Sequence, residues 1–300
     1  MRFNVLPVLF ILLFNAVSFS QENSDGIDPN KIRRYVPLDN VLAKGISLTR
    51  NDSLNFHFSE GDTLVLITPA LEKFFPMGIQ VRIEPQDSLF IEKYKTIVYG
   101  PLNSPNRNKQ SPKIWKDGIR LYFDPSVPKQ HQKALWKFAQ RLSSQVDSLH
   151  IQKVSKRNKA NYFVFYRNTE EAFDLEPRIT DTRSGYYLNW INNSFSRATL
   201  KVNSFSFSGE KEIINDLKRR FFETLGYFKS SDKLTCGSML ATCGEYRAVS
   251  EEDLDLLKYH YSYQNCYGID LKEFECQHEQ RRQKFTEYPY IKMYVSHLKK

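Results

Sequence analysis

The charged side chains of the segment 217–226 have the spacing best suited to chemistry. Arg219 and Glu223 stand four residues apart, and Arg220 follows the first of them. Side chains at i and i+4 share one face of a helix, so Arg219 and Glu223 are expected to pair, which contributes about 0.3–0.5 kcal/mol on an exposed helix. In the alternative interpretation, Arg219 lies inside a cleft and holds that cleft together by its charge.

Other catalytic patterns are missing from the sequence. It contains no G-x-S-x-G serine motif and no glycine-rich phosphate loop. No two histidines have the i,i+4 spacing that lets one helix face bind a zinc ion. We therefore expect no catalytic residue, no zinc and no other cofactor. The histidines are His57, His131, His150, His260, His278 and His297.

The first twenty residues are typical of a signal peptide. Arg2 supplies positive charge, residues 5–14 form an apolar run, and Ser18 and Ser20 are small residues before a cleavage site ahead of Gln21. No cysteine follows that site, as a lipid anchor would require. We expect the mature chain to be exported, periplasmic or extracellular, and to have no transmembrane segment.

All four cysteines lie near the C-terminal end, at Cys236, Cys243, Cys266 and Cys276. Export permits disulfides, and four cysteines allow three pairings. We predict Cys236–Cys243 and Cys266–Cys276, because each pairing closes a short local loop. A zinc site is the alternative, although the sequence has no C-x-x-C pair.

The composition is that of a folded globular protein. Of 300 residues, 41% are hydrophobic and 26% are charged, which excludes a disordered or collagen-like chain. The formal net charge is +9, yet basic and acidic residues are interleaved. Because no known nucleic-acid-binding motif accompanies this charge, we expect no nucleic-acid partner. The charge alone suggests an acidic polysaccharide or a lipid surface as a further class of partner.

The hydrophobic pattern predicts an α+β fold, with helices packed on a mixed sheet. Short alternating segments between 35 and 100, the last at 96–99, indicate a small β-rich region before that sheet. Residues 100–113 are rich in proline and asparagine and are predicted to form a linker. The predicted parts are the signal peptide at 1–20, the β-rich region with its linker at 21–111, the main domain at 112–268 and a basic C-terminal extension at 269–300.

Two helices of the main domain have recognisable ends. One begins near Ser208 and ends at Gly226, a glycine that is expected to adopt the left-handed conformation. The last helix of the domain follows Ser250, which matches a capping box with Asp253. The other predicted elements are a strand at 119–123, a helix at 129–149, and strands at 162–166, 185–190 and 198–202.

Several of these segments resemble the zincin metallopeptidases, and among them the matrixin-like metzincins, over residues 112–268. Residues 217–226 lie where those enzymes carry the active-site helix, 237–240 with Met239 is similar to their methionine turn, and 249–257 is similar to the helix that follows. The chain is also similar to an uncharacterised family of exported bacterial proteins, whose equivalent helix reads E-E-x-x-Q-x-L-G.

The resemblance implies a zincin-like fold that has lost its metal ligands. Aligning Gly226 with the glycine of H-E-x-x-H-x-x-G-x-x-H places Arg219, Arg220, Glu223 and Lys229 at the four chemically active positions. A guanidinium keeps its proton in proteins and cannot bind a cation, so the resemblance implies no catalytic zinc. It also implies that Met239 serves as core packing in its turn.

The sequence therefore favours a non-catalytic function, either binding of a peptide or partner protein through the inherited cleft or a structural function in the cell envelope. Tyr186, Tyr187 and Trp190 lie on the expected edge-strand side and are candidate contacts for an extended peptide added as a strand. Ordinary core or surface packing of these aromatic residues is the alternative. The alternative function is a secreted metallopeptidase-like hydrolase whose metal ligands lie elsewhere.

Overall fold

The computed structural model describes residues 34–59, 62–75, 79–243, 248–265, 267–291 and 293–297. The chain divides into two compact units, Met1–Met77 and Gly78–Lys300. The predicted signal peptide lies outside the described residues. No helix in the described ranges combines the length and the hydropathy that a bilayer-spanning segment needs.

The first unit is built on a small antiparallel sheet with strand order β1-β3-β2. Its core consists of Val36, Val41, Val65 and Leu71. The strand expected at 63–67 is present as β3, whereas the one expected at 54–58 begins only at His57, and short helices that the alternating pattern did not indicate lie between the strands. The elements are β1 (Tyr35–Pro37), α1 (Leu38–Ala43), α2 (Arg50–Leu54), β2 (His57–Ser59), β3 (Asp62–Leu66) and α3 (Pro69–Glu72).

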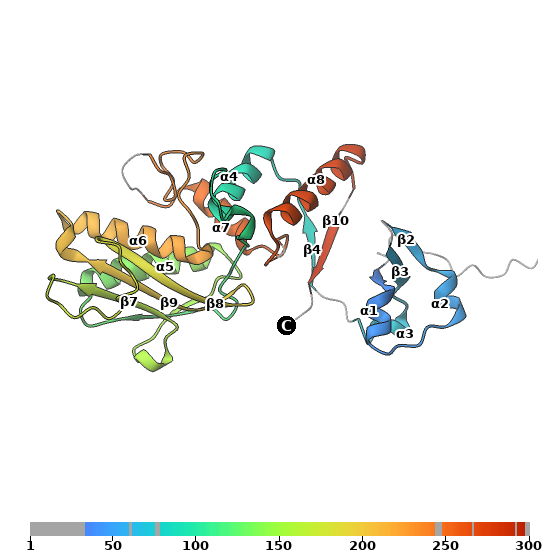
Figure 1. Cartoon of the computed structure of the whole chain (residues 1–300), viewed down its shortest axis with the longest axis horizontal. Coiled ribbons are helices and arrows are strands. Elements are labelled where there is room, and N and C mark those ends of the chain that lie inside the picture. The colour runs from blue at the N-terminus through green and yellow to red at the C-terminus, as the bar shows by residue number, and fades with distance from the viewer. Residues whose placement is uncertain are drawn as a thin grey trace, which may run out of the picture. The chain divides into compact units, whose positions relative to one another are not determined.

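The second unit contains a five-stranded mixed sheet with strand order β6-β5-β7-β9-β8. The first four of these strands run parallel, whereas β8 runs antiparallel to β9 at the edge. Figure 1 labels β7, β9 and β8 of this sheet. In β5 every second residue is buried, as the alternating sequence predicts. The strands are β5 (Ile119–Phe123), β6 (Ile151–Lys153), β7 (Tyr162–Arg167), β8 (Ser184–Ile191) and β9 (Ser194–Asn203).

Two long helices, α5 (Lys129–Gln145) and α6 (Glu210–Gly226), lie side by side along this sheet (Figure 1). The ring of Phe138 on α5 contacts that of Phe221 on α6, which in turn contacts Tyr162 of β7. The apolar residues at helical spacing thus form the interface between helices and sheet. This confirms the predicted α+β class with helices packed on a mixed sheet.

Three further helices, α4 (Ser88–Tyr99), α7 (Glu251–Tyr261) and α8 (Leu271–Glu287), extend the same core. Tyr94 of α4 packs edge-on against Tyr259 of α7 and stacks on Phe274 of α8. A two-stranded antiparallel ribbon pairs β4 (Ile79–Ile83) with β10 (Met293–His297). The capping box of Ser250 and Asp253 at the start of α7 is present as predicted.

Two predictions of local structure are wrong. Residues 96–99, expected to be a strand, are the last turn of α4, because a short apolar run fits a buried helix as well as a buried strand. Residues 100–113, expected to be a linker, include a 3₁₀ turn, η1 (Arg107–Lys109). The buried Arg107 donates to the carbonyl oxygen of Gly100 over 2.6 Å, so the segment is packed rather than loose.

Candidate functional site at the edge strand

The predicted pair on α6 is present, and its carboxylate is buried. Arg219 Nε lies 3.2 Å from Glu223 Oε1, and Arg220 NH1 lies 3.1 Å from Glu223 Oε2. The Glu223 side chain is only 5% exposed, whereas the two arginines are about one-third exposed. Both carboxylate oxygens therefore accept hydrogen bonds from guanidinium groups at the inner face of the helix.

The two arginines also connect α6 to its surroundings. Arg220 Nε donates to Ser184 Oγ of β8 over 3.2 Å, and its guanidinium lies 3.6 Å from a carboxylate oxygen of Asp181. Arg219 NH2 donates to Ser230 Oγ, beyond the helix end, over 2.7 Å. These contacts tie the helix to the edge strand and to the segment that follows it, which an exposed i,i+4 pair would not do.

Burial dominates the electrostatics of Glu223. Desolvation raises the pKa of this carboxyl, and the opposing effects of Arg220 and Arg219 do not fully offset it. The charged carboxylate is thus held in position by its partners, while its burial carries a net energetic cost. No cluster of three or more histidine, cysteine or carboxylate side chains with metal-binding geometry occurs among the described residues.

Replacing Arg220 by alanine is expected to lower the free energy of unfolding by about 2 kcal/mol, because the buried carboxylate loses one of two cations. Glu223→Gln is expected to change it by less than about 1 kcal/mol, since the burial that raises the pKa of this carboxyl offsets much of the attraction of its charge to the arginines. Urea unfolding at pH 7 measures both. A larger loss for Glu223→Gln than for Arg220→Ala would contradict this account.

The end of α6 directs an aromatic side chain toward the edge strand. Gly226 is the last helical residue, but the left-handed conformation that was predicted for it is adopted by Tyr227, with φ 56° and ψ 38°. Tyr227 packs against Tyr186 and Trp190 of β8, with ring centroids 6.3 and 5.8 Å away. Lys229, the last position of the aligned motif, places its ammonium 3.3 Å from the centre of the Tyr227 ring.

A second lysine completes what we call the edge cluster: Lys113, Tyr186, Trp190, Tyr227 and Lys229. Lys113 Nζ lies 5.1 Å from the centre of the Trp190 ring. Burial lowers the pKa of Lys113, and repulsion by Lys229 lowers it further. Neither ammonium forms an ion pair with a carboxylate in the part of the chain that the structure describes. The cluster therefore places two ammonium groups without carboxylate partners among the described residues beside aromatic rings, of which only Trp190 is exposed; Lys113 is buried, and its Nζ donates to Ser111.

The sequence anticipated only part of this cluster. Tyr186 and Trp190 belong to it, whereas Tyr187 lies elsewhere and stacks under the guanidinium of Arg178 at 3.9 Å. Lys113 and Tyr227 were missed. Nothing in the sequence indicated Lys113, which stands in the segment predicted as a linker, and the position of Tyr227 directly after Gly226 gave no sign that its side chain would face β8.

The predicted methionine turn lies beside the start of α7. Met239 is buried, and its backbone N–H donates to both oxygens of Asp253, 3.1 and 3.0 Å away. The same carboxylate accepts the hydroxyl hydrogen of Ser238. One buried aspartate thus caps α7 and holds the turn, so that Met239 contributes to the core.

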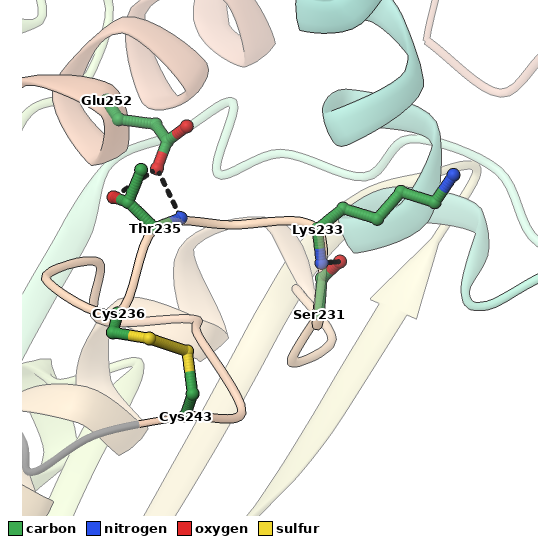
Figure 2. The surroundings of a disulfide bond; sticks show 6 residues. All are labelled: Ser231, Lys233, Thr235, Cys236, Cys243 and Glu252. Carbon is green, nitrogen blue, oxygen red and sulfur yellow. Dashed lines mark hydrogen bonds between the residues drawn. A yellow bond between two sulfur atoms is a disulfide. The ribbon is translucent and has the colours of Figure 1, made fainter.

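Figure 2 shows the disulfide that closes this turn, Cys236–Cys243, one of the two predicted pairings. Next to it, the backbone N–H and hydroxyl of Thr235 donate to Glu252 of α7 over 3.1 and 2.9 Å. Closing so short a loop is expected to contribute about 2 kcal/mol of stability through the entropy of the unfolded chain. In the second predicted pairing, Cys276 is exposed on α8, and Cys266 lies outside the described residues.

Comparison with known proteins gives no family assignment. No protein-family model matches this chain, and no curated protein matches it. The resemblance of residues 112–268 to zincins therefore stays a prediction.

Proposed function

We propose that this chain is an exported, non-catalytic protein with a zincin-like fold that binds an extended acidic peptide segment of a partner protein along β8. Among the described residues, β8 is paired with β9 alone. The opposite edge of such a strand carries backbone N–H and C=O groups that an added strand can pair with. A cell-envelope partner would supply that peptide after export.

The edge cluster is the observation that carries this proposal. Trp190 is 43% exposed and the neighbouring Ile191 is 69% exposed, so apolar surface lies along the free edge. The half-buried Lys229 lies against the ring of Tyr227, where its ammonium would attract a carboxylate on the incoming peptide, and the buried Lys113 adds positive charge beside Trp190. Backbone pairing would supply affinity, while the aromatic and basic side chains would select acidic segments.

The charges on α6 support a binding rather than a catalytic function. Both oxygens of Glu223 are engaged by guanidinium groups. A general base must be free to take a proton from water or substrate, and this carboxylate has no unoccupied approach of that kind in the arrangement described. We therefore favour a binding function over the alternative of a metallopeptidase-like hydrolase.

Binding to a short strand-forming peptide of alternating valine and threonine with one central glutamate tests the proposal. We expect calorimetric binding to the mature protein, accompanied by a change in tryptophan fluorescence. Lys229→Ala should weaken this binding about tenfold, because a charge-assisted contact is lost. Lys133→Ala, which removes an exposed lysine of α5, is the matched control and should leave the affinity unchanged.

Two results would contradict the proposal. Equal affinity for the same peptide with lysine in place of glutamate would show that the edge cluster does not select for acidic charge. Stoichiometric zinc in the purified protein, together with peptide cleavage that chelation abolishes, would show that the chain is a hydrolase.

A further inference from the structure

A second candidate site is a cavity of about 670 Å³, which shares no residue with the edge cluster. It lies between α4, α7, α8 and the segment that joins β4 to α4. Cavities of a few hundred to a thousand cubic ångströms are typical of small-molecule sites in proteins. Its apolar wall is formed by Ile83, Pro85, Ile91, Tyr259, Phe285 and Pro289.

The acidic side chains that line the cavity already have cationic partners. Lys95 contacts Glu92 and Glu275 at 2.5 and 2.6 Å, and Arg282 contacts Glu279 at 2.7 Å. The remaining acid, Glu84, pairs with Arg82 of β4 at 3.1 Å. Each carboxylate of the wall thus has a cationic contact within the protein, and Lys95 is shared by two of them.

Arg281 is the exception among the basic groups of the cavity. Its NH1 atom donates to the backbone oxygen of Gln264 over 3.3 Å, and it has no carboxylate partner in the described part of the chain. A guanidinium that lacks a carboxylate partner and lies beside apolar side chains is a receptor for a single anionic group.

His278 lies on the same wall as Arg281. Its Nε2 atom lies 2.8 Å from the hydroxyl oxygen of Tyr259, and its ring contacts that of Phe274. Burial lowers the pKa of His278 to about 4, with further lowering from the charges of Arg281 and Lys95. The imidazole is therefore neutral at pH 7 and leaves Arg281 as the anion receptor.

We propose that this cavity binds a single-chain amphiphile that carries one carboxylate, with the carboxylate on Arg281 and the hydrocarbon chain against Ile83, Ile91 and Phe285. The apolar wall removes the chain from water, which drives binding in proportion to the buried area. The bidentate geometry of the guanidinium then favours a carboxylate head over a hydroxyl or an ammonium.

Calorimetric titration of the mature protein with dodecanoate below its micellar concentration, beside dodecanol and dodecylamine, tests the proposal. We expect dodecanoate to bind with one-to-one stoichiometry and at least about tenfold more tightly than either head-group control. Arg281→Gln should remove that preference and leave dodecanol binding unchanged. Arg282→Gln is the matched control, because that arginine lies on the same wall and is already paired with Glu279.

A measurement on the unmodified protein keeps the test decisive if Arg281→Gln fails to fold. Nuclear magnetic resonance of the His278 ring should show its pKa rise when dodecanoate binds, because an added anion offsets the repulsion by Arg281. Dodecanol should not produce this rise. No binding of dodecanoate, equal binding of dodecanol, or an equal loss in Arg281→Gln and Arg282→Gln would overturn the proposal.

Discussion

Replacing Gly226 by alanine is expected to lower the free energy of unfolding by about 3 kcal/mol. A Cβ atom at this position would lie 2.3 and 2.4 Å from two ring carbons of Phe228 and 2.8 Å from Nε2 of His260. Both neighbours are buried, so neither can move into solvent. Overpacking of this kind typically costs about 1–3 kcal/mol.

The sign of that effect separates packing from helix propensity. Gly226 is the last residue of α6, where propensity alone would make alanine better than glycine by up to about 1 kcal/mol. Urea unfolding measures the difference. Gly237→Ala is the control, since nothing lies within 4 Å of its added Cβ and a change within about 0.5 kcal/mol is expected. Unchanged or increased stability of Gly226→Ala would contradict the expected overpacking against Phe228 and His260.

The same glycine shows what the sequence could and could not predict. A glycine after the periodic apolar residues correctly placed the end of α6. The left-handed conformation predicted for it was wrong, because Tyr227 adopts that backbone conformation. Gly226 is needed instead because a side chain at this position would collide with Phe228. A missing Cβ serves a turn or a close contact equally well, and the sequence does not distinguish them.

Local sequence patterns correctly predicted those helices and strands whose structure depends only on residues within the element. The alternation of 119–123 predicted β5, and the capping box of Ser250 and Asp253 predicted the start of α7. The wrong assignment of 96–99 could have been avoided from a nearby residue. Asp87 caps α4 by accepting a hydrogen bond from the Phe90 N–H over 3.1 Å. An aspartate at such a position before an apolar run is a helix-start signal that was overlooked.

Composition gave a wrong prediction for a segment whose structure depends on long-range contacts. Residues 100–113 have the proline and asparagine content of a linker, yet the carbonyl oxygen of Lys113 accepts a hydrogen bond from His260 of α7 over 2.9 Å. The edge cluster depends on the same segment, since Lys113 reaches Trp190 from outside the sheet. Spacing along α6 predicted Arg219 as a partner of Glu223, whereas a cluster drawn from separate elements has no signature in a single sequence.

The stability of the protein is expected to fall by up to about 3 kcal/mol through His260 as the pH drops from about 6.5 to about 4. His260 is fully buried, and its Nε2 must carry the hydrogen, because the Lys113 carbonyl can only accept. Its Nδ1 then accepts from the hydroxyl of Tyr94 over 3.0 Å. Burial lowers the pKa of this imidazole to about 4 from its usual 6.5.

The direction follows from proton binding in the two states. Below pH 6.5 the unfolded chain protonates this histidine and the folded chain does not, so proton binding stabilises the unfolded state, and the free energy of unfolding falls by about 1.4 kcal/mol per pH unit. The stability that the neutral imidazole contributes is fully present above pH 6.5 and is lost as the pH falls toward 4. The lowered pKa of His278 acts in the same direction, whereas the raised pKa of Glu223 acts in the opposite direction.

The difference between variants isolates the His260 contribution from these other groups. Urea unfolding of the native chain and of His260→Gln at a series of pH values from 4.5 to 8 should give a flatter profile for the variant, although it is less stable at pH 7. His150→Gln, at an exposed position, should keep the native profile. Parallel profiles for the native chain and His260→Gln would show that the buried imidazole does not couple folding to pH.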